Sequence, residues 1–120
     1  MRKDVIENAL KGLHKSSRDI KGCAVISLDG QMVASSMKPG MDPDRVRTMS
    51  AAVQKLGKEA ARALGCGALE QIMLKGDSGY VLLIGAGEDA VLSVITDVSA
   101  KLGLVLQDAR GAVGSINESG

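Results

Sequence analysis

The stretch Gly79–Asp97, GYVLLIGAGEDAVLSVITD, reads as the centre of a β-sheet. It contains two apolar runs, Gly79–Ile84 and Ala90–Thr96, and the glycine-rich segment 85–89 separates them. Runs of β-branched residues and leucine without polar breaks are typical of strands that are covered on both faces. We therefore predict a hairpin in the middle of a sheet, with helices packed on both sides of it.

Size and composition predict one small domain with an aliphatic core. The chain has 120 residues, which is the usual size of a single domain, and Tyr80 is its only aromatic residue. Proteins that bind single-stranded nucleic acids usually stack the bases on aromatic side chains. A net charge of +1 also offers no general attraction to DNA or to a membrane surface. We therefore expect no nucleic-acid binding and no membrane insertion.

The beginning of the chain and its cysteines favour a cytoplasmic location. The sequence MRKDVIENALKGL is charged and amphipathic, and it lacks the apolar segment of a signal peptide. No apolar run approaches the roughly 20 residues that span a membrane. Cys23 and Cys66 are the only cysteines, and their separation matches neither a zinc site nor a C-x-x-C redox motif. We expect both thiols to be reduced.

The rest of the chain alternates between helical and strand-like patterns. Apolar residues at helical spacing predict three helices, over residues 2–17, 42–64 and 97–116. Strand-like patterns occupy three more segments, Gly22–Leu28, Gln31–Met37 and Leu69–Lys75. The order is therefore α-β-β-α-β-β-β-α, an α+β fold with five mostly antiparallel strands. We expect residues 1–116 to form this single domain and residues 117–120 to be a disordered tail.

The middle helix carries different residues on three sides. The apolar stripe that we expect to face the core is Val46, Met49, Val53, Leu56, Ala60 and Leu64. The small residues beside it are Ser50, Gly57 and Ala61. The polar and basic residues expected on the outer side are Arg47, Gln54, Lys55, Lys58 and Arg62. Because glycine inside a helix costs about 1 kcal/mol relative to alanine, Gly57 either occupies a tolerant position or marks the close approach of another helix, such as that of a second copy.

Motifs that would indicate catalysis do not fit their surroundings. The string GAGEDA at 85–90 matches the glycine fingerprint of dinucleotide-binding folds, but that motif needs a helix after its second glycine, and the strand-forming VLSVIT follows here. His14 is the only histidine and lies on the polar side of the first helix, so no histidine base is expected beside a nucleophile. We predict no catalytic residues, no cofactor and no metal site, which leaves a binding function. The basic side of the middle helix is the candidate surface, and an ordinary solvated helix face is the alternative.

Four segments carry a family resemblance: GCAVISLDGQMVAS, a long helix ending in ALGCGALEQIMLKG, GYVLLIGAGEDAVLSVITD, and KLGLVLQDARGAV. In this order they resemble the roadblock / dynein light chain family, and most of all its prokaryotic MglB-type branch. The resemblance covers residues 4–116. It implies the strand order 2-1-5-4-3, with the middle helix on one face of the sheet and the two terminal helices on the other. It also implies a homodimer, in which the third strands join and the middle helices lie side by side.

The resemblance also implies a function. Members of this family bind and regulate small Ras-like GTPases, and MglB-type homodimers activate them without an active site of their own. Carried over by position, the candidate dimer interface is Ser50, Gly57, Ala61, Leu69, Gln71, Ile72 and Met73. The candidate GTPase-binding surface is Arg47, Gln54, Lys55, Lys58 and Arg62. We expect a non-catalytic activator or adaptor of a GTPase; the alternatives are a structural scaffold of the light-chain type and a small-molecule-sensing domain.

Overall fold

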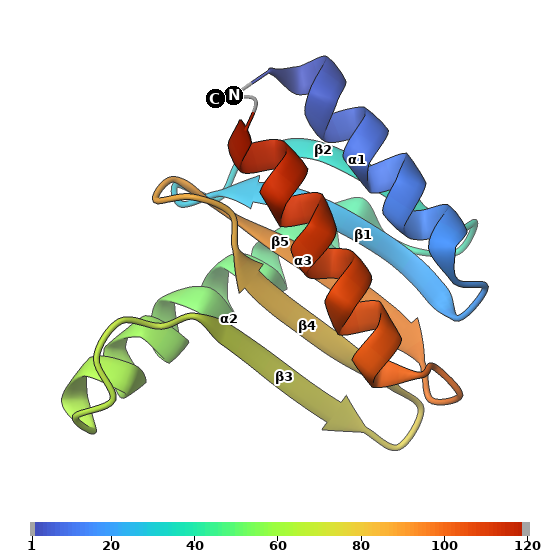
Figure 1. Cartoon of the computed structure of the whole chain (residues 1–120). Helices are drawn as coiled ribbons and strands as arrows, with labels where there is room; N and C mark the ends of the chain where they lie inside the picture. The colour runs from blue at the N-terminus through green and yellow to red at the C-terminus, as the bar shows by residue number, and fades with distance from the viewer. Residues whose placement is uncertain (1, 119–120) are drawn as a thin grey trace.

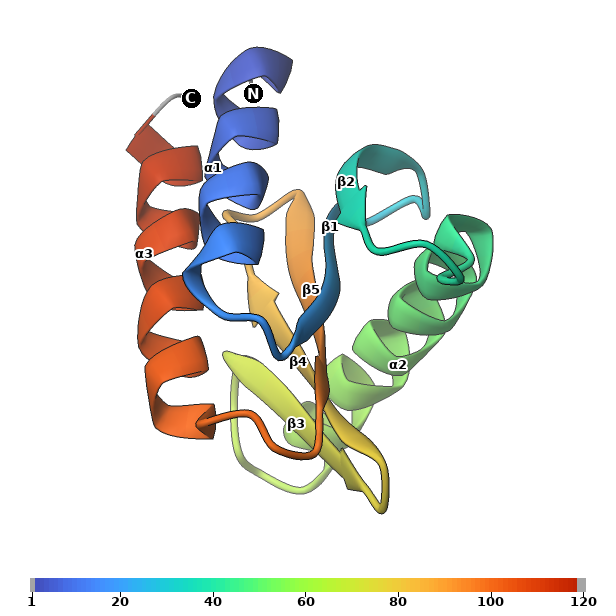
Figure 2. The ribbon, with the colours of Figure 1, turned by 90° about the vertical axis from the view of Figure 1, so that its right-hand side faces the viewer.

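One antiparallel sheet separates the helices into two layers in the computed structural model, which describes residues 2–118 (Figures 1 and 2). The elements in chain order are α1 (Lys3–Ser16), β1 (Ile20–Ser27), β2 (Met32–Met37), α2 (Pro43–Ala63), β3 (Gln71–Gly76), β4 (Gly79–Gly85), β5 (Ala90–Asp97) and α3 (Leu102–Glu118). Neighbouring strands all pair antiparallel, in the order β2-β1-β5-β4-β3. Figure 2 shows α1 and α3 on one face and α2 on the other. The expected fold class and strand order are confirmed.

The predicted hairpin is formed by β4 and β5, and β5 is the central strand of the sheet. Leu92 and Ser93 of β5 point to opposite faces of the sheet and are both fully buried, as expected for a strand covered on both sides. The turn that joins the two strands has Gly87 at a φ of 79°, a left-handed conformation that favours glycine. A strand follows this turn, so the glycine fingerprint lacks the helix that a dinucleotide site requires.

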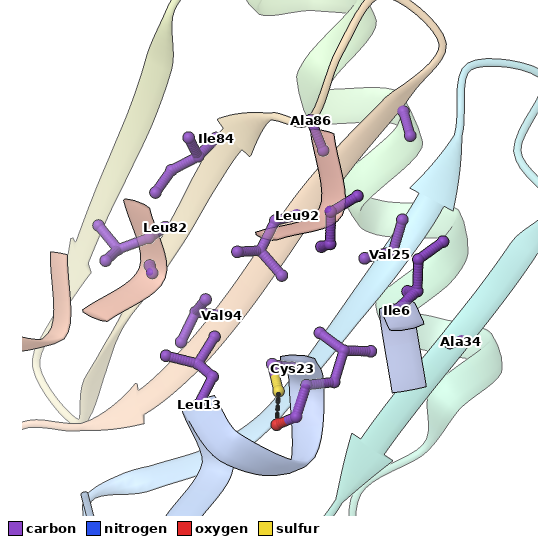
Figure 3. Close-up of a cluster of buried hydrophobic side chains, with 14 of the residues drawn as sticks. Ile6, Leu13, Cys23, Val25, Ala34, Leu82, Ile84, Ala86, Leu92 and Val94 are labelled. Atoms are coloured by element: carbon purple, nitrogen blue, oxygen red, sulfur yellow. Dashed lines mark hydrogen bonds between the residues drawn. The ribbon is translucent and has the colours of Figure 1, made fainter. Parts of the chain in front are cut away.

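The apolar side chains form two clusters, one on each face of the sheet. The larger cluster lies under α1 and α3, and Figure 3 shows Leu82, Leu92 and Val94 of the sheet together with Leu13 of α1 in it. The smaller cluster lies under α2 and consists of Ala24, Ile26, Leu83 and Val91. Most of the apolar surface that holds the fold together is therefore buried on the face away from α2.

The ends of the helices follow from local capping and burial. The side chain of Asp42 accepts hydrogen bonds from the backbone N–H groups of Asp44 and Arg45, and Pro43 occupies the first turn, so α2 begins as predicted. The last helix begins later than expected, at Leu102, because β5 continues through Asp97 and a turn follows it, in which the N–H of Ala100 donates to the carbonyl of Asp97. It also includes residues 117 and 118 of the expected tail, since the buried Ile116 anchors its last turn. The other two tail residues, 119 and 120, lie outside the described residues.

The two cysteines differ strongly in their surroundings. Cys23 is fully buried in β1, its thiol donates to the backbone carbonyl of Leu10 at 3.5 Å (Figure 3), and burial raises its pKa to about 12. Cys66 is exposed after the end of α2. Because the thiolate is the reactive form, we expect a thiol reagent at pH 8 to label one cysteine of the native protein, Cys66, and to label Cys23 only after unfolding. Rapid labelling of both thiols in the native protein, measured by mass spectrometry, would contradict this burial.

Candidate interaction surface of α2 and β3

The side of α2 that faces the sheet is lined by small and polar residues. Ser50 is 6% exposed, and its hydroxyl donates to the hydroxyl of Ser93 at 3.0 Å. A Cβ atom at Gly57 would lie 2.5 Å from Cδ1 of Ile72, so the helix axis comes close to the sheet there. The predicted stripe of small residues therefore does mark a close approach, but to the chain's own sheet. Within the single chain Ser50 and Gly57 therefore contact the sheet, and their place in a dimer interface stays a prediction.

The predicted core stripe of α2 is largely on the surface. Met49 and Leu56 are 58% and 66% exposed, and Leu64 beyond the helix end is 79% exposed. Only Val46 and Val53 pack against the smaller apolar cluster. The apolar side of the helix is thus rotated away from the sheet, since the small residues take the central position. We call the exposed residues Met49, Leu56 and Ala60 the apolar flank of α2.

Strand β3 is an open edge of the sheet. Within residues 2–118 it pairs only with β4. The backbone N–H of Gly85 donates to the carbonyl of Glu70, and inward and outward backbone groups alternate along an antiparallel strand. The odd-numbered residues of β3 therefore turn their N–H and C=O groups to the outside, and these residues are Gln71, Met73 and Lys75. Such an edge is free to pair with another strand.

The apolar flank and the open edge form one continuous surface. A cavity of about 230 Å³ between α2 and the sheet is lined by Met49 and Val53 on the helix side and by Leu74 and Val81 on the sheet side. Leu74 is 45% exposed, and Met73 on the other face of the same strand is 43% exposed. Clustered exposed apolar side chains beside an unpaired strand are typical of surfaces that bind protein. We call this region the α2–β3 surface.

The opposite side of α2 is basic and faces two turns of the sheet. Lys55, Lys58 and Arg62 are exposed, and we call them the basic flank. Arg47 is half-buried, because its guanidinium donates to the carbonyl of Gly30 at 2.9 Å and to the carboxylate of Asp44 at 2.7 Å. Gln54 is buried and only 7% exposed, so its predicted place on the outer side is wrong. The residues of the candidate GTPase surface are therefore split between solvent and the inside of the domain.

The remaining predicted interface residues lie at or near the α2–β3 surface. Leu69 and Ile72 are half-buried against Gly57 of α2, and Ala61 is half-buried one turn further along the helix. The side chain of Gln71 is held on the other face of the sheet, where its amide oxygen accepts from the guanidinium of Arg110 at 2.7 Å. These side chains are close enough to the open edge to border a partner that pairs with β3.

His14 differs from its expected exposed position. It is half-buried, and its Nδ1 lies 2.7 Å from the hydroxyl of Ser36 on β2. It therefore links α1 to the sheet. Across residues 2–118, no group of three or more histidine, cysteine, aspartate or glutamate side chains is arranged to hold a metal ion. In the same part of the chain, no helix has the length and the apolar character needed to cross a membrane.

These features define a class of protein: a small α+β domain whose open sheet edge lies beside an exposed apolar helix flank. The chain belongs to the Roadblock/LC7 domain family, because the sequence model of that family matches residues 7–96. The resemblance noted in the sequence is thereby confirmed. The matched range includes all five strands and α2, except for Asp97 at the end of β5.

Relatives and solved structures agree with this assignment. An uncharacterised protein of Methanocaldococcus jannaschii is 36% identical over 101 residues, which cover 84% of this chain and 87% of that protein. The structure of MglB from Myxococcus xanthus is similar with a TM-score of 0.89 at 19% identity, over 98% of this chain and 88% of that chain. Gliding protein MglB from Thermus thermophilus has a TM-score of 0.87 at 20% identity, over 97% and 88% of the two chains. At these identities the structural likeness establishes the shared fold.

Proposed function

We propose that this protein is a non-catalytic regulator, an activator or an adaptor, of a small Ras-like GTPase, and that it acts as a cytoplasmic homodimer. Membership of the Roadblock/LC7 family and the fold shared with MglB support a regulatory role. The observation that carries the proposal is the contrast between the two flanks of α2. One flank is apolar and continues into an open strand edge, and the other is basic and faces away from that edge.

The α2–β3 surface is the proposed contact between two copies. In a twofold dimer the two copies use the same surface patch for their contact. Two β3 edges can then pair antiparallel and extend the sheet. The same twofold arrangement brings the apolar flanks of the two α2 helices together, which removes Met49 and Leu56 from water. Of the residues first expected here, Leu69, Gln71, Ile72 and Met73 stay part of the proposal, with Ala61 at its border. Met49 and Leu56 join them, and Ser50 and Gly57, which contact the sheet in the single chain, also stay predicted parts of the interface.

The basic flank is the proposed contact with the GTPase. It lies on the other side of α2 from the apolar flank, so dimerisation leaves Lys55, Lys58 and Arg62 accessible on both copies. Exposed lysine and arginine side chains attract an acidic surface and accelerate encounter with it. A dimer that binds one conformation of the GTPase better than the others shifts the population of GTPase molecules toward that conformation. This regulation needs no catalytic group from the present chain.

The test is a GTP hydrolysis and nucleotide exchange assay with Ras-like GTPases from the same organism. We expect the protein to form a complex with one of them and to change one of the two rates. The double variant Lys55→Glu/Lys58→Glu is expected to weaken the complex about tenfold or more, because two attractive charges become repulsive. The matched control is Lys11→Glu/Lys15→Glu, which makes the same charge change at exposed positions of α1 on the other face.

The outcomes separate the possible roles. A complex that leaves both rates unchanged would contradict an activator and would leave an adaptor or a structural scaffold. The absence of any complex, with unchanged rates, would refute GTPase binding altogether. Equal loss of affinity in the two double variants would show that the contact lies outside the basic flank.

A further inference from the structure

Strand β2 is the second open edge of the sheet, at the end opposite β3 (Figure 1). In the part of the chain that the structure describes, it pairs only with β1. The backbone N–H of Lys38 donates to the carbonyl of Lys21 at 2.9 Å, so alternate residues before Lys38 also turn their backbone groups inward. Ser35 and Met37 lie between those residues and turn their N–H and C=O groups outward. Each of the two therefore offers one donor and one acceptor to a further strand.

A β-bulge blunts only the first part of this edge. The register shifts between Val25 and Ile26 of β1, and Val33 of β2 has no direct partner across from it. Bulges, charged side chains and proline are the usual means by which proteins protect a sheet edge from pairing. The pairing is regular from Ala34 to Met37, and this stretch, ASSM, contains neither a charge nor a proline. The second half of β2 therefore stays open to an additional strand.

A groove of about 370 Å³ lies between α1 and the edge strand. Lys3, Glu7 and Lys11 line it on the helix side, and residues 32–35 line it on the strand side. The ammonium group of Lys3 lies 4.0 Å from the carboxylate of Glu7. Lys11 is exposed, and among residues 2–118 it has no ion pair or side-chain hydrogen bond. The groove thus has one positive charge available to a carboxylate from outside the chain.

The two faces of β2 offer different surroundings to a neighbouring strand. Ala34 belongs to the larger apolar cluster and faces α1 and the groove. Ser35 pairs with a residue of the smaller cluster, so it faces the α2 side of the sheet, as does the half-buried Met37. Side chains alternate between the two faces along a strand. A strand added to β2 would therefore place every second side chain on the side of Lys11 and the others on the side of Met37.

We propose that β2 binds an extended segment of a partner protein that alternates acidic and apolar residues and joins the sheet as an additional antiparallel strand. In this mode of recognition backbone hydrogen bonds provide affinity, and alternate side chains provide specificity. Antiparallel pairing is chosen because it is slightly more stable per residue than parallel pairing. Charge excludes a second copy as the occupant, since its own α1 would bring another unpaired Lys11 to the same edge.

The proposed site is separate from the proposed dimer and GTPase contacts. It lies at the far end of the sheet from β3 and beside α1, so it uses neither the α2–β3 surface nor the basic flank of α2. Pairing of two copies through β3 leaves both β2 edges open. A failure of the GTPase assays would therefore not affect this site, and the reverse also holds.

The first test is titration of isotope-labelled protein with the peptide Val-Glu-Val-Glu-Val, capped at both ends, followed by NMR. We expect saturable shifts at the amides of Ser35 and Met37, with a Kd of about 1 mM or below. The peptide Val-Lys-Val-Lys-Val should bind about tenfold more weakly or less, because Lys11 repels it. No shift of these two amides at millimolar peptide would overturn the proposal, and so would shifts at Met73 of β3 in their place.

The second test asks whether the peptide pairs through its backbone. In the antiparallel arrangement the valines turn their N–H groups toward β2, and the glutamates turn theirs to solvent. A methyl group on the nitrogen of the central valine is therefore expected to abolish binding, because it removes a hydrogen bond and blocks the close approach. A methyl group on the nitrogen of a glutamate is the matched control and should leave binding in place. Equal binding of the two methylated peptides would contradict strand addition.

The third test separates this site from the GTPase contact by charge reversal. Lys11→Glu/Lys15→Glu is expected to weaken binding of the acidic peptide about tenfold or more, whereas Lys55→Glu/Lys58→Glu should leave it unchanged. This is the reverse of the order expected for the GTPase complex. Undiminished binding by Lys11→Glu/Lys15→Glu would contradict the role of the groove. Amide exchange at Ser35 that slows with protein concentration in the absence of peptide would identify a second copy as the occupant and overturn the proposal.

Discussion

Replacement of Leu56 by glutamate is expected to dissociate the dimer and to leave the fold of each chain intact. Leu56 is 66% exposed in the single chain, so the new carboxylate is well solvated there. In the proposed dimer it would be enclosed between two apolar flanks without a cation, and burying an unpaired charge costs several kcal/mol. We expect association to weaken more than about 100-fold, equivalent to ~3 kcal/mol. Sedimentation velocity measures the mass, and circular dichroism checks the fold.

Leu104→Glu is the matched control for this experiment. Leu104 is also a largely exposed leucine, at 57%, but it lies on α3 on the other face of the sheet. This variant is expected to remain a dimer. If Leu56→Glu stayed dimeric, or if Leu104→Glu dissociated to the same extent, the apolar flank of α2 would not be the contact.

Gly79→Ala is expected to cause the largest loss of stability among the glycine substitutions in the β3–β4 hairpin. A Cβ atom at Gly79 would overlap the backbone carbonyl oxygen of Thr96 in β5, the central strand. Because that oxygen belongs to backbone held in the sheet, it cannot move away as the end of a side chain can. Overpacking of this kind costs about 1–3 kcal/mol, so a fall of roughly 5–10 °C in the melting temperature is expected.

The neighbouring Gly76 offers the control for this substitution. A Cβ atom there would have Gly79 O, at 3.7 Å, as its nearest neighbour, which is an ordinary contact distance. Gly76→Ala is therefore expected to melt within a few degrees of the unmodified protein in differential scanning calorimetry. Equal destabilisation by both variants would mean that the turn, and not the overlap with β5, limits the stability of the hairpin.

The sheet could be predicted from the sequence because its centre is covered on both faces. Uninterrupted apolar residues then mark β4 and β5, and the glycine-rich segment 85–89 separates them. The strand order came from the family resemblance, since residue patterns alone do not say which strands are neighbours. The start of α2 was also predictable, because its capping residues Asp42 and Pro43 act locally.

The orientation of α2 could not be predicted from its apolar residues. Periodicity shows that Met49 and Leu56 share a side with Val53, and a single chain would be expected to bury that side. The sheet instead contacts the small residues, where Gly57 permits a close approach to Ile72. The stripe of small residues at Ser50, Gly57 and Ala61 is the available signal, but the sequence leaves open whether Gly57 is a tolerant position or a close contact with another helix. The burial of Gln54 follows from the same orientation, because Gln54 lies four residues after Ser50 and three before Gly57 and so shares their side of the helix.

Amide hydrogen exchange at Met73 tests the proposed dimer most directly, because it needs no substitution. In the single chain the N–H of Met73 points to the open edge of β3 and should exchange rapidly with solvent. In the proposed dimer the same N–H pairs with a strand of the second copy. We expect slow exchange at high protein concentration that becomes faster on dilution, while the amide of Leu74, which pairs with β4, stays protected throughout. Rapid exchange at Met73 at every concentration would contradict the joining of two copies through β3.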